Sequence, residues 1–348
     1  MRTEQQAPLP QARPAARRMK AIVQDEYGEA ADVLRLEEVD RPEIGDAEVL
    51  LRVQAAGLDR GAWHAMAGLP YPIRLAGFGL RTPKNRVPGS EVAGRVEAVG
   101  KDVTRFAVGD EVFGIAAGSF AEYARAREDK LAPRPTNLSA EQAAAVGVSA
   151  VTALQAVRDR GRVQPRQKVL VIGASGGVGT YALQIAKAFG AEVTGACSTG
   201  KVDLVRSLGA DHVVDYTQHD VTDGKQRYDV ILDIGGQRPL RHLRRALAPR
   251  GTLVIVGSET GGRWLGGTDR QLRAMALSPF IGQKLGTFVC SENAQDLLVL
   301  SELIESGQVV PCVDRTYPLG EATEAIQYLQ AGQARGKVVI MVRTSVPG

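Results

Sequence analysis

The stretch from Val169 to Gly179, VLVIGASGGVG, constrains the fold more than any other part of the chain. Its four leading apolar residues predict a buried strand, its glycines a tight turn, and the apolar periodicity of residues 181–189 a helix. This order is the first half of a βαβ unit, whose glycine turn brings backbone N–H groups and the positive end of a helix dipole up to a pyrophosphate. The predicted dinucleotide site is formed by Ser175, Gly176, Gly177, Val178 and Gly179.

The details of this loop favour one cofactor over another. The first glycine of the usual pattern is Ala174, which is small enough for the turn as long as its φ stays negative. Gly176 is expected to let the backbone approach the pyrophosphate, and Gly179 to let helix and strand pack closely. A NAD-specific site usually has an acidic residue at the end of the second strand. Here that strand ends without an acid, and Lys201 would attract a 2′-phosphate, so we predict NADPH.

The chain around the loop alternates between strand and helix patterns. A capping sequence at Ser139 predicts a helix start, and a basic helix is expected at residues 239–247. Strands separated by helical stretches predict right-handed βαβ units and a parallel sheet. The strands are expected at residues 168–172, 192–197, 212–215, 228–234 and 252–256, with one more at 285–290.

The two ends of the chain have a different character. From residue 19 to about residue 138, short β-rich runs are separated by Gly, Pro and Asp, and the pattern contains little helix. Residues 336–342 return to strand. We therefore predict an α/β protein with a β-rich domain of residues 19–139 and 291–348 and a doubly wound parallel-sheet domain of residues 140–290. Residues 1–18 lack apolar periodicity and are predicted to be a disordered tail.

The charge of the chain limits its partners. The net charge is +4, and four arginines against one glutamate in the tail account for most of it. The rest is nearly balanced, so we expect no nucleic-acid partner. No apolar run reaches the ~18 residues of a membrane span. Three widely spaced cysteines indicate reduced thiols and a cytoplasmic protein, while the Arg-rich tail also leaves a transit peptide open.

Further motifs accompany the glycine loop: VPGSEVAGRVEAVG at 87–100, GDEVFG at 109–114, GSFAEYA at 118–124, EQAAAVGVSAVTALQAV at 141–157, LVRSLGADHVVDY at 204–216 and RGKVVI at 335–340. With these motifs residues 19–348 resemble the medium-chain dehydrogenase/reductases, specifically the quinone oxidoreductase (zeta-crystallin-like) branch. The resemblance implies a GroES-like catalytic domain, a Rossmann domain, and a cleft between them where a nicotinamide meets its substrate. It also implies a homodimer, in which an edge strand such as 285–290 extends the sheet across a twofold axis.

The same resemblance assigns residues to the cofactor. It places Ser198, Lys201 and Tyr216 around the adenosine 2′-phosphate of NADPH. It also places three residues near the nicotinamide or at strand ends close to the bound cofactor: Thr152, Gly235 and Gly257.

The resemblance further places residues 59–71 at the cleft. Reduction of a carbonyl system needs a hydrogen-bond donor and a proton at the developing negative charge. The candidate catalytic residues in this segment are Asp59, His64 and Tyr71, and Asp59 stands where quinone oxidoreductases often have Asn. The nearby apolar side chains are expected either to line the pocket or to pack in the core: Trp63, Leu75 and Phe78.

The sequence lacks the usual zinc ligands of this superfamily. Zinc alcohol dehydrogenases have a Gly-His-Glu sequence whose histidine binds the metal, and this chain has Ser90 at that position. No cysteine precedes Cys197. A catalytic zinc needs three well-placed N, S or O ligands, and His64 with Asp59 and Glu91 is a poor set. We therefore predict no metal site.

Together these features predict a zinc-independent, NADPH-dependent reductase of a small-molecule quinone or α,β-unsaturated carbonyl. Both substrates accept hydride without a metal because the negative charge delocalises. One alternative is reduction of an enoyl thioester on CoA or a carrier, for which a basic rim of Arg74, Arg81, Lys84 and Arg86 would be used. The other is a non-catalytic NADPH-binding protein.

Overall fold

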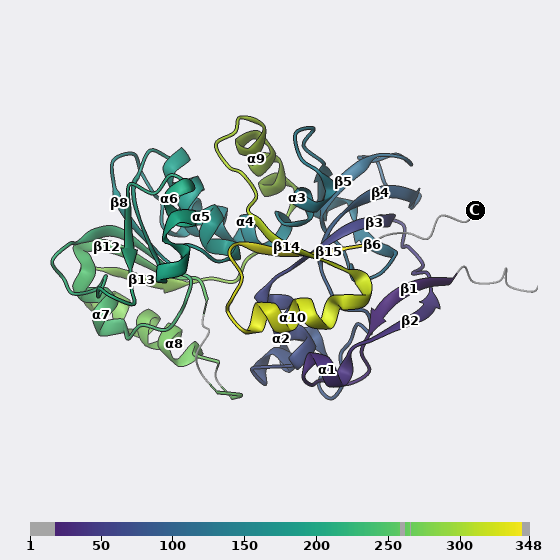
Figure 1. Ribbon diagram of the computed structural model, residues 1–348, viewed down its shortest axis with the longest axis horizontal. Helices are drawn as coiled ribbons and strands as arrows, with labels where there is room; N and C mark the ends of the chain where they lie inside the picture. Colours follow the sequence, from purple (N-terminus) through teal and green to yellow (C-terminus); the bar gives the residue numbers. More distant parts are fainter. Residues whose placement is uncertain (1–17, 258–261, 265, 343–348) are drawn as a thin grey trace, which may run out of the picture.

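The computed structural model describes residues 18–257, 262–264 and 266–342 (Figure 1). The predicted tail, residues 1–18, lies outside the described residues except for its last member. Arg18 does not belong to a tail, because it begins strand β1 (Arg18–Val23), which pairs with β2 (Arg35–Asp40). Its guanidinium lies 3.1 Å from the Asp40 carboxylate, so the predicted boundary of the tail is wrong by at least this residue.

A seven-stranded, mainly antiparallel sheet forms the β-rich end of the molecule. In its strand β3 (Glu48–Leu58) half-buried and buried residues alternate, and Val49, Leu51 and Val53 face the core. The strand order is β14-β15-β3-β4-β5-β7, and β6 pairs with β3. The other strands are β4 (Glu91–Val99), β5 (Glu111–Ile115), β6 (Tyr123–Arg127), β7 (Leu131–Pro133), β14 (Val313–Pro318) and β15 (Lys337–Met341).

The sequence pattern did not single out helix α2 (Arg60–Ala67), which follows β3 directly. The helix begins there because the Asp59 carboxylate accepts a hydrogen bond from the Ala62 N–H and caps it. It ends at Gly68, whose φ of +62° favours glycine. The cap and the glycine fix the position of the predicted catalytic segment. The other helices at this end are α1 (Ala30–Val33) and α10 (Ala322–Gln330).

A six-stranded parallel sheet forms the other end, as predicted. Its order, β10-β9-β8-β11-β12-β13, has a switch point between β8 and β11, where the two halves of the sheet grow apart. Ligands of such sheets bind at the switch point, outside the carboxyl ends of the strands. The strands are β8 (Lys168–Ile172), β9 (Glu192–Cys197), β10 (His212–Asp215), β11 (Tyr228–Asp233), β12 (Leu247–Ile255) and β13 (Lys284–Thr287).

Helices cover both faces of the parallel sheet. Val169 and Val171 of β8 pack in one core with residues of α4, α5 and α9, whereas Leu170 and Ile172 pack in another with residues of α7 and α8. As predicted, Ser139 caps a helix, in a capping box with Gln142. The helices of this part of the chain are α4 (Gly147–Gln155), α5 (Gly177–Ala188), α6 (Val202–Ser207), α7 (Leu240–Ala246), α8 (Thr268–Leu277) and α9 (Ala294–Glu305), whereas α3 (Ala140–Ala144) packs against β3 and β4 of the first sheet.

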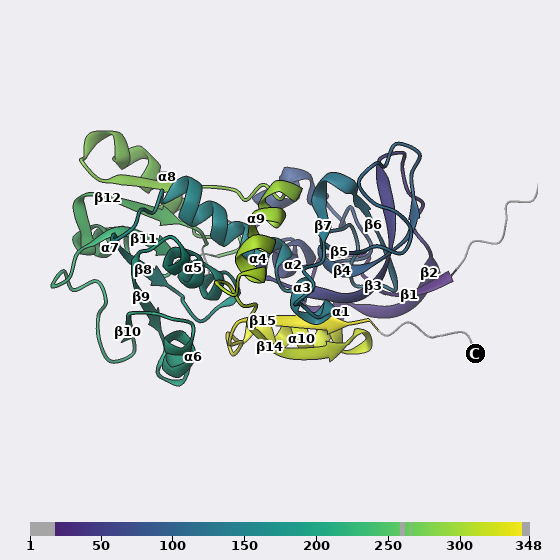
Figure 2. The same ribbon diagram turned by 90° about the horizontal axis from the view of Figure 1, so that it is seen from above.

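The two sheets lie at opposite ends of the molecule, and the last strands of the chain return to the first sheet (Figures 1 and 2). The domain boundaries, residues 19–139 with 291–348 and residues 140–290, stay a prediction, and residues 343–348 lie outside the described part. Within the part that the structure describes, no helix is long and apolar enough to cross a membrane.

Candidate active site

The glycine loop joins β8 to α5 at the carboxyl edge of the parallel sheet. Its positive φ, +84°, falls on Gly173 and not on the buried Ala174. A β-carbon on Gly179 would overlap the Gly173 carbonyl oxygen, so only glycine allows the helix to lie this close to the strand. A β-carbon on Gly176 would meet only the same oxygen, at 3.5 Å, so the outer side of this backbone is open.

The N-terminus of α5 faces that open side. Its N-cap is Gly176, and no side chain caps its first N–H groups. A helix of 12 residues presents free donors and a positive partial charge there, which are the two properties that a pyrophosphate needs. Residues 175–179, among them the buried Ser175, therefore fit the diphosphate of a dinucleotide.

Both predicted strand-end glycines lie at the same edge. Gly235 follows β11 beside the loop, since a β-carbon on Gly173 would come within 3.1 Å of the Gly235 nitrogen. Gly257 follows β12, and a β-carbon there would come within 2.7 Å of the Ile234 carbonyl oxygen. Thr152 belongs to α4, and its hydroxyl donates to the Val148 carbonyl at 2.7 Å. The glycines thus keep the edge of the sheet clear of side chains.

A buried ion pair that sequence reasoning missed holds the turn after β11. Asp233, fully buried at the end of β11, accepts from Arg270 of α8 at 2.5 Å and from the Gly236 N–H at 3.3 Å. Arg270 also donates to the Arg238 carbonyl at 2.9 Å. The only feature of the sequence that could have indicated this pair is the acidic residue at the end of an otherwise apolar strand. The pair fixes the backbone around Gly235 and ties α8 to it.

A cavity of about 530 Å³ opens beside the end of β9. Two of the predicted 2′-phosphate residues, Ser198 and Lys201, line it, whereas Tyr216 is half-exposed and is not among the lining residues. The Lys201 ammonium donates to the carbonyl oxygens of Gly332 at 3.0 Å and Ala334 at 2.7 Å. Lys201 therefore connects the parallel-sheet end to the loop before β15.

The opposite wall of this cavity adds two cations that sequence reasoning did not assign. Arg315 of β14 and Arg335, the first residue of the RGKVVI motif, both line it. Asp314, the one carboxylate among the described lining residues, already accepts from the Tyr328 hydroxyl at 2.8 Å and from the Arg335 N–H at 2.9 Å. The cavity therefore carries a net positive charge, which suits a phosphate group.

The predicted catalytic residues Asp59 and His64 lie on the first turn and a half of α2. Asp59 uses Oδ1 for the cap, and its buried Oδ2 has no partner within the described residues. The buried indole N–H of Trp63 likewise has none there. An unsatisfied acceptor and an unsatisfied donor, four residues apart at the start of one helix, are thus buried polar groups whose partners would have to be a water or a bound molecule.

Burial and a backbone contact favour the neutral form of the His64 imidazole. Its Nδ1 lies 2.8 Å from the Leu69 carbonyl, which only accepts, so Nδ1 carries the proton. Burial lowers the pKa of His64 below its ordinary value of 6.5. Nε2 therefore presents a lone pair, and this geometry favours accepting a hydrogen bond over donating a proton.

Tyr71 lies where the two ends of the molecule meet. Its N–H donates to the Arg263 carbonyl at 2.8 Å, and its ring meets that of Trp264 edge-on at 5.1 Å. Trp63 is half-buried against the core, but Leu75 and Phe78 are 78% and 43% exposed. Core packing of Leu75 and Phe78 was therefore a wrong expectation, because their π-helical turn lies at the surface.

The basic rim proposed for a thioester substrate is partly engaged. Arg86 pairs with Asp25 at 2.6 Å and with Glu37 at 2.9 Å. Arg74 donates to the Gly68 carbonyl at 2.8 Å and lies over the Tyr27 ring. Two of the four basic side chains thus have structural partners, which weakens that hypothesis.

Next to Ser90, the fully buried Glu91 pairs with the buried Lys337. Glu91 also accepts from the Val148 N–H at 2.7 Å and the Ser149 N–H at 3.2 Å, and Lys337 donates to the Ser149 hydroxyl at 3.0 Å. Burial raises the pKa of Glu91, and the Lys337 ammonium opposes this. No group of three or more His, Cys, Asp or Glu that could hold a metal occurs among the described residues.

The fold and this edge of the sheet define a dinucleotide-dependent oxidoreductase with a GroES-like domain. The family model for the alcohol dehydrogenase GroES-like domain matches residues 45–136, and the zinc-binding dehydrogenase model matches residues 208–340. The chain belongs to the medium-chain dehydrogenase/reductase superfamily, in its quinone oxidoreductase branch.

Relatives similar over most of the chain support this membership. The 2-methylene-furan-3-one reductase of Solanum lycopersicum is 33% identical and covers 92% of this chain and 79% of its own. The chloroplastic NADPH-dependent alkenal/one oxidoreductase of Arabidopsis thaliana is 34% identical with the same coverage. The solved structure of the quinone oxidoreductase from Coxiella burnetii superposes with a TM-score of 0.82, at 27% identity, over 94% of this chain and 100% of its own.

Proposed function

We propose that the protein reduces a quinone or an α,β-unsaturated carbonyl with NADPH and needs no zinc. The observation that carries the proposal is the edge of the parallel sheet, where an open helix N-terminus and a cationic cavity fit the diphosphate and the 2′-phosphate. The names of the relatives, which include an NADPH-dependent alkenal/one oxidoreductase and a quinone oxidoreductase, support the substrate class.

When bound, NADPH supplies the hydride, and the chain supplies position and electrostatics. The N–H groups of residues 177–179 would orient the diphosphate, since the Gly176 N–H already donates to the Gly173 carbonyl at 3.1 Å, and Lys201 with Arg335 would hold the 2′-phosphate. The unpartnered Trp63 N–H can donate to a carbonyl oxygen as it becomes negative. His64 accepts a hydrogen bond, and the Tyr71 hydroxyl is the remaining predicted proton donor.

Two observations support a reaction without zinc. Ser90 replaces the histidine ligand of the zinc enzymes, and the adjacent carboxylate of Glu91 is already held by Lys337 and two backbone N–H groups. A carboxylate with these partners does not need a metal to balance its charge.

NADPH oxidation with a panel of quinones, enones and enoyl-CoA esters tests the proposal. We expect turnover with quinones or enones that a zinc chelator leaves unchanged. Turnover confined to enoyl thioesters would favour the alternative substrate, and tight NADPH binding without any turnover would favour a non-catalytic protein. Loss of activity with the chelator, restored by added zinc, would contradict the zinc-free reaction.

His64 makes stability depend on pH. Because its pKa is lower when folded than when unfolded, the unfolded chain binds the proton first, and stability falls as pH drops below about 6.5. We expect His64→Gln to remove a slope of up to about 1.4 kcal/mol per pH unit from denaturant titrations in this range. The exposed His219 provides the control variant His219→Gln, and an equal loss of slope there would contradict the assignment.

The oligomer and the location of the protein remain proposals. We propose a homodimer formed through β13, which is an edge strand of the parallel sheet in the described residues. A cytoplasmic location stays a prediction, because one of the relatives is named as chloroplastic.

A further inference from the structure

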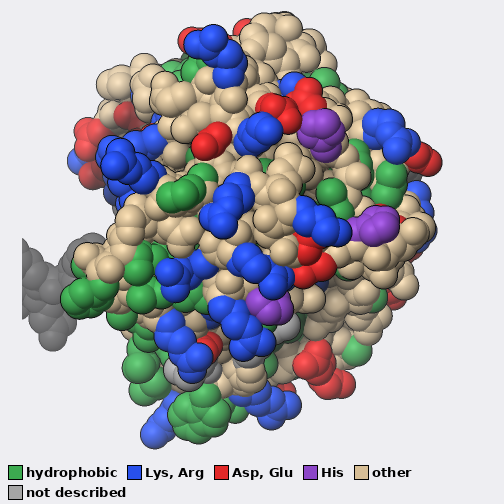
Figure 3. Space-filling model, turned by 90° about the vertical axis from the view of Figure 1, so that its left-hand side faces the viewer, with side chains coloured by type: hydrophobic (Ala, Val, Ile, Leu, Met, Phe, Trp, Pro, Cys, Tyr) green, Lys and Arg blue, Asp and Glu red, His purple; other side chains and the backbone are tan. Residues whose placement is uncertain are grey.

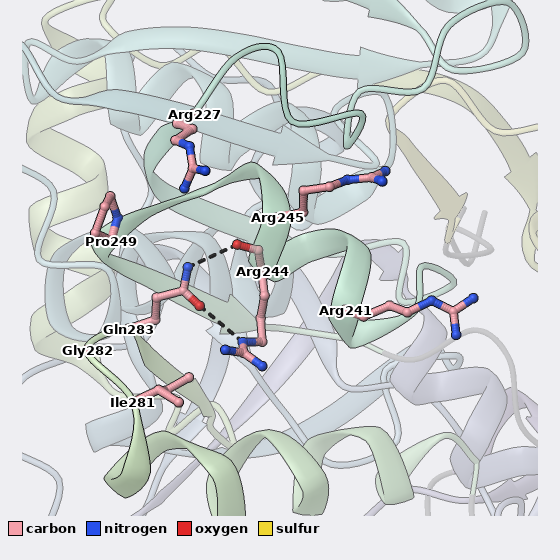
Figure 4. A pocket seen from close by; sticks show the side chains of 8 residues that line it. All are labelled: Arg227, Arg241, Arg244, Arg245, Pro249, Ile281, Gly282 and Gln283. Atoms are coloured by element: carbon pink, nitrogen blue, oxygen red, sulfur yellow. Dashed lines mark hydrogen bonds between the residues drawn. The ribbon is translucent and has the colours of Figure 1, made fainter.

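A second cavity, of about 460 Å³, lies where β11, β12 and β13 begin (Figure 4). Because these are the amino ends of parallel strands, the cavity is at the opposite edge of the sheet from the glycine loop. It is therefore separate from the proposed cofactor site. Its lining comes from the residue before β11, from α7, from β12 and from the segment before β13: Arg227, Arg241, Arg244, Arg245, Pro249, Ile281, Gly282 and Gln283.

Among the described residues, the lining contains four arginines and no acid. Arg245 lies 3.4 Å from Asp220, whose carboxylate also binds Arg238 at 2.7 Å. Within the part of the chain that the structure describes, the other three arginines of the lining form no ion pair. The surrounding surface offers further positive charge, since Lys and Arg side chains gather across the middle of this face (Figure 3). The basic helix predicted at residues 239–247 therefore lines a cavity and does not merely present its charges to solvent.

Gln283 holds one of these guanidiniums in a fixed orientation. Its Oε1 accepts from Arg244 Nε at 3.1 Å. Its Nε2 donates to the carbonyl oxygens of Arg244 at 2.9 Å, Leu247 at 3.3 Å and Ala248 at 3.3 Å. The amide is therefore anchored on both sides, and the two terminal nitrogens of Arg244 have no other partner in the described residues. A guanidinium whose Nε is held in place presents its two terminal nitrogens as a fork. This fork can bind two oxygens of one phosphate at once.

Among the other arginines of the lining, Arg227 lies on the side of this fork, whereas the Arg241 and Arg245 side chains extend away from it (Figure 4). In Figure 4 Arg227 extends toward the contact between Gln283 and Arg244. Arg227 makes one long hydrogen bond, 3.4 Å, to the Leu247 carbonyl. Arg241 precedes Arg244 by three residues on α7, so the two positive charges lie on neighbouring positions of one helix face and repel each other. A bound anion with more than one charge would remove this repulsion.

We propose that this cavity binds a small molecule carrying a diphosphate or several phosphate groups, through Arg227, Arg241 and Arg244. Three guanidiniums from two separate segments suit an anion with several oxygens and more than one charge better than a single carboxylate. The volume lies within the range of small-molecule sites, about 300–1,000 Å³. Binding would tie the residue before β11, α7 and the segment before β13 together and so stabilise the folded protein.

Calorimetric titration of the full-length protein with pyrophosphate tests this proposal. One equivalent of NADPH per chain is added first at low ionic strength, so that the cofactor site is filled without an excess of NADPH that could itself occupy the arginine cavity. We expect saturable binding of one pyrophosphate per chain. Arg244→Gln and Arg227→Gln should each weaken it at least about tenfold, since each removes a charge-assisted contact. Quinone reduction should be the same in both variants as in the wild type.

The matched control is Arg250→Gln, which removes one exposed charge of β12 beside Pro249 but none from the lining. It should leave pyrophosphate binding unchanged. No saturable binding by the wild type, or equal weakening in the control, would overturn the proposal. Binding to anionic phospholipid vesicles or to RNA without binding of pyrophosphate would also overturn it, in favour of a surface for a larger partner.

Discussion

Replacing Lys337 with Met is expected to destabilise the protein by about 3–5 kcal/mol. The substitution removes the partner of the Glu91 carboxylate, and both side chains are at least 99% buried, with exposed fractions of 0% and 1%. Water cannot reach the carboxylate that is left behind, so the variant loses the attraction of the ion pair while the desolvation penalty of Glu91 remains. Chemical denaturation at neutral pH measures the loss.

The double variant Glu91→Gln with Lys337→Met should recover most of that stability. A glutamine at 91 is neutral, and its Oε1 can still accept from the N–H groups of Val148 and Ser149. The control is Lys187→Met, which breaks a half-exposed ion pair with Asp211 and should cost no more than about 1 kcal/mol. Equal losses of stability in Lys337→Met and Lys187→Met would show that breaking the buried pair costs no more than breaking a half-exposed one.

The pH dependence of the Lys337→Met variant gives a second readout. Burial raises the pKa of Glu91 in the folded state, and the variant lacks the ammonium that opposes this. The folded chain then holds a proton that the unfolded chain has already lost, so stability falls as pH rises above the unfolded value of about 4.5. Acidification should therefore partly rescue the variant. A variant whose stability instead rises with pH over this range would contradict a buried, unpaired Glu91.

The parts of the fold that were predictable from sequence are those set by local chemistry. The strand, the glycine turn and the helix at residues 169–189 follow from apolar periodicity and from where glycine stands. The cap at Ser139 was predictable for the same reason, whereas the edge position of the strand near residue 285 came from the family resemblance. Helix α2 was missed because a single cap, Asp59, starts it in a segment without strong periodicity.

The parts of the candidate site that were missed depend on contacts between distant residues. Glu91 and Lys337 are 246 positions apart, and each alone resembles an ordinary charged residue beside a strand. Arg335 was visible as the start of a motif, but its place opposite Lys201 depends on how β15 returns to the first sheet. Gln283 gains its importance only because the segment before β13 folds against α7. Spacing along the chain does not contain this information.

Lys201→Gln is expected to lower kcat/KM for NADPH by about 10–100-fold and to leave kcat/KM for NADH nearly unchanged. A phosphate paired with an ammonium contributes about 1.5–3 kcal/mol through its charge-assisted hydrogen bonds, and glutamine keeps the length of the side chain without the charge. NADH lacks the 2′-phosphate and therefore loses nothing. Arg335→Gln, on the opposite wall of the same cavity, should act in the same direction.

Lys201 also makes a structural contact. The comparison of NADPH with NADH must separate the effect of this contact from recognition of the 2′-phosphate. Its ammonium donates to the carbonyl oxygens of Gly332 and Ala334, so its loss could loosen the loop before β15. A purely structural role would lower turnover with NADPH and NADH equally and would lower the melting temperature, whereas recognition of the phosphate changes only their ratio. The control Arg206→Gln removes an exposed charge of α6 that does not line the cavity and should leave the ratio unchanged. Lys201→Arg, which keeps the charge, should retain most of the preference for NADPH, and an equal loss of preference in Lys201→Arg and Lys201→Gln would contradict a charge-based selection.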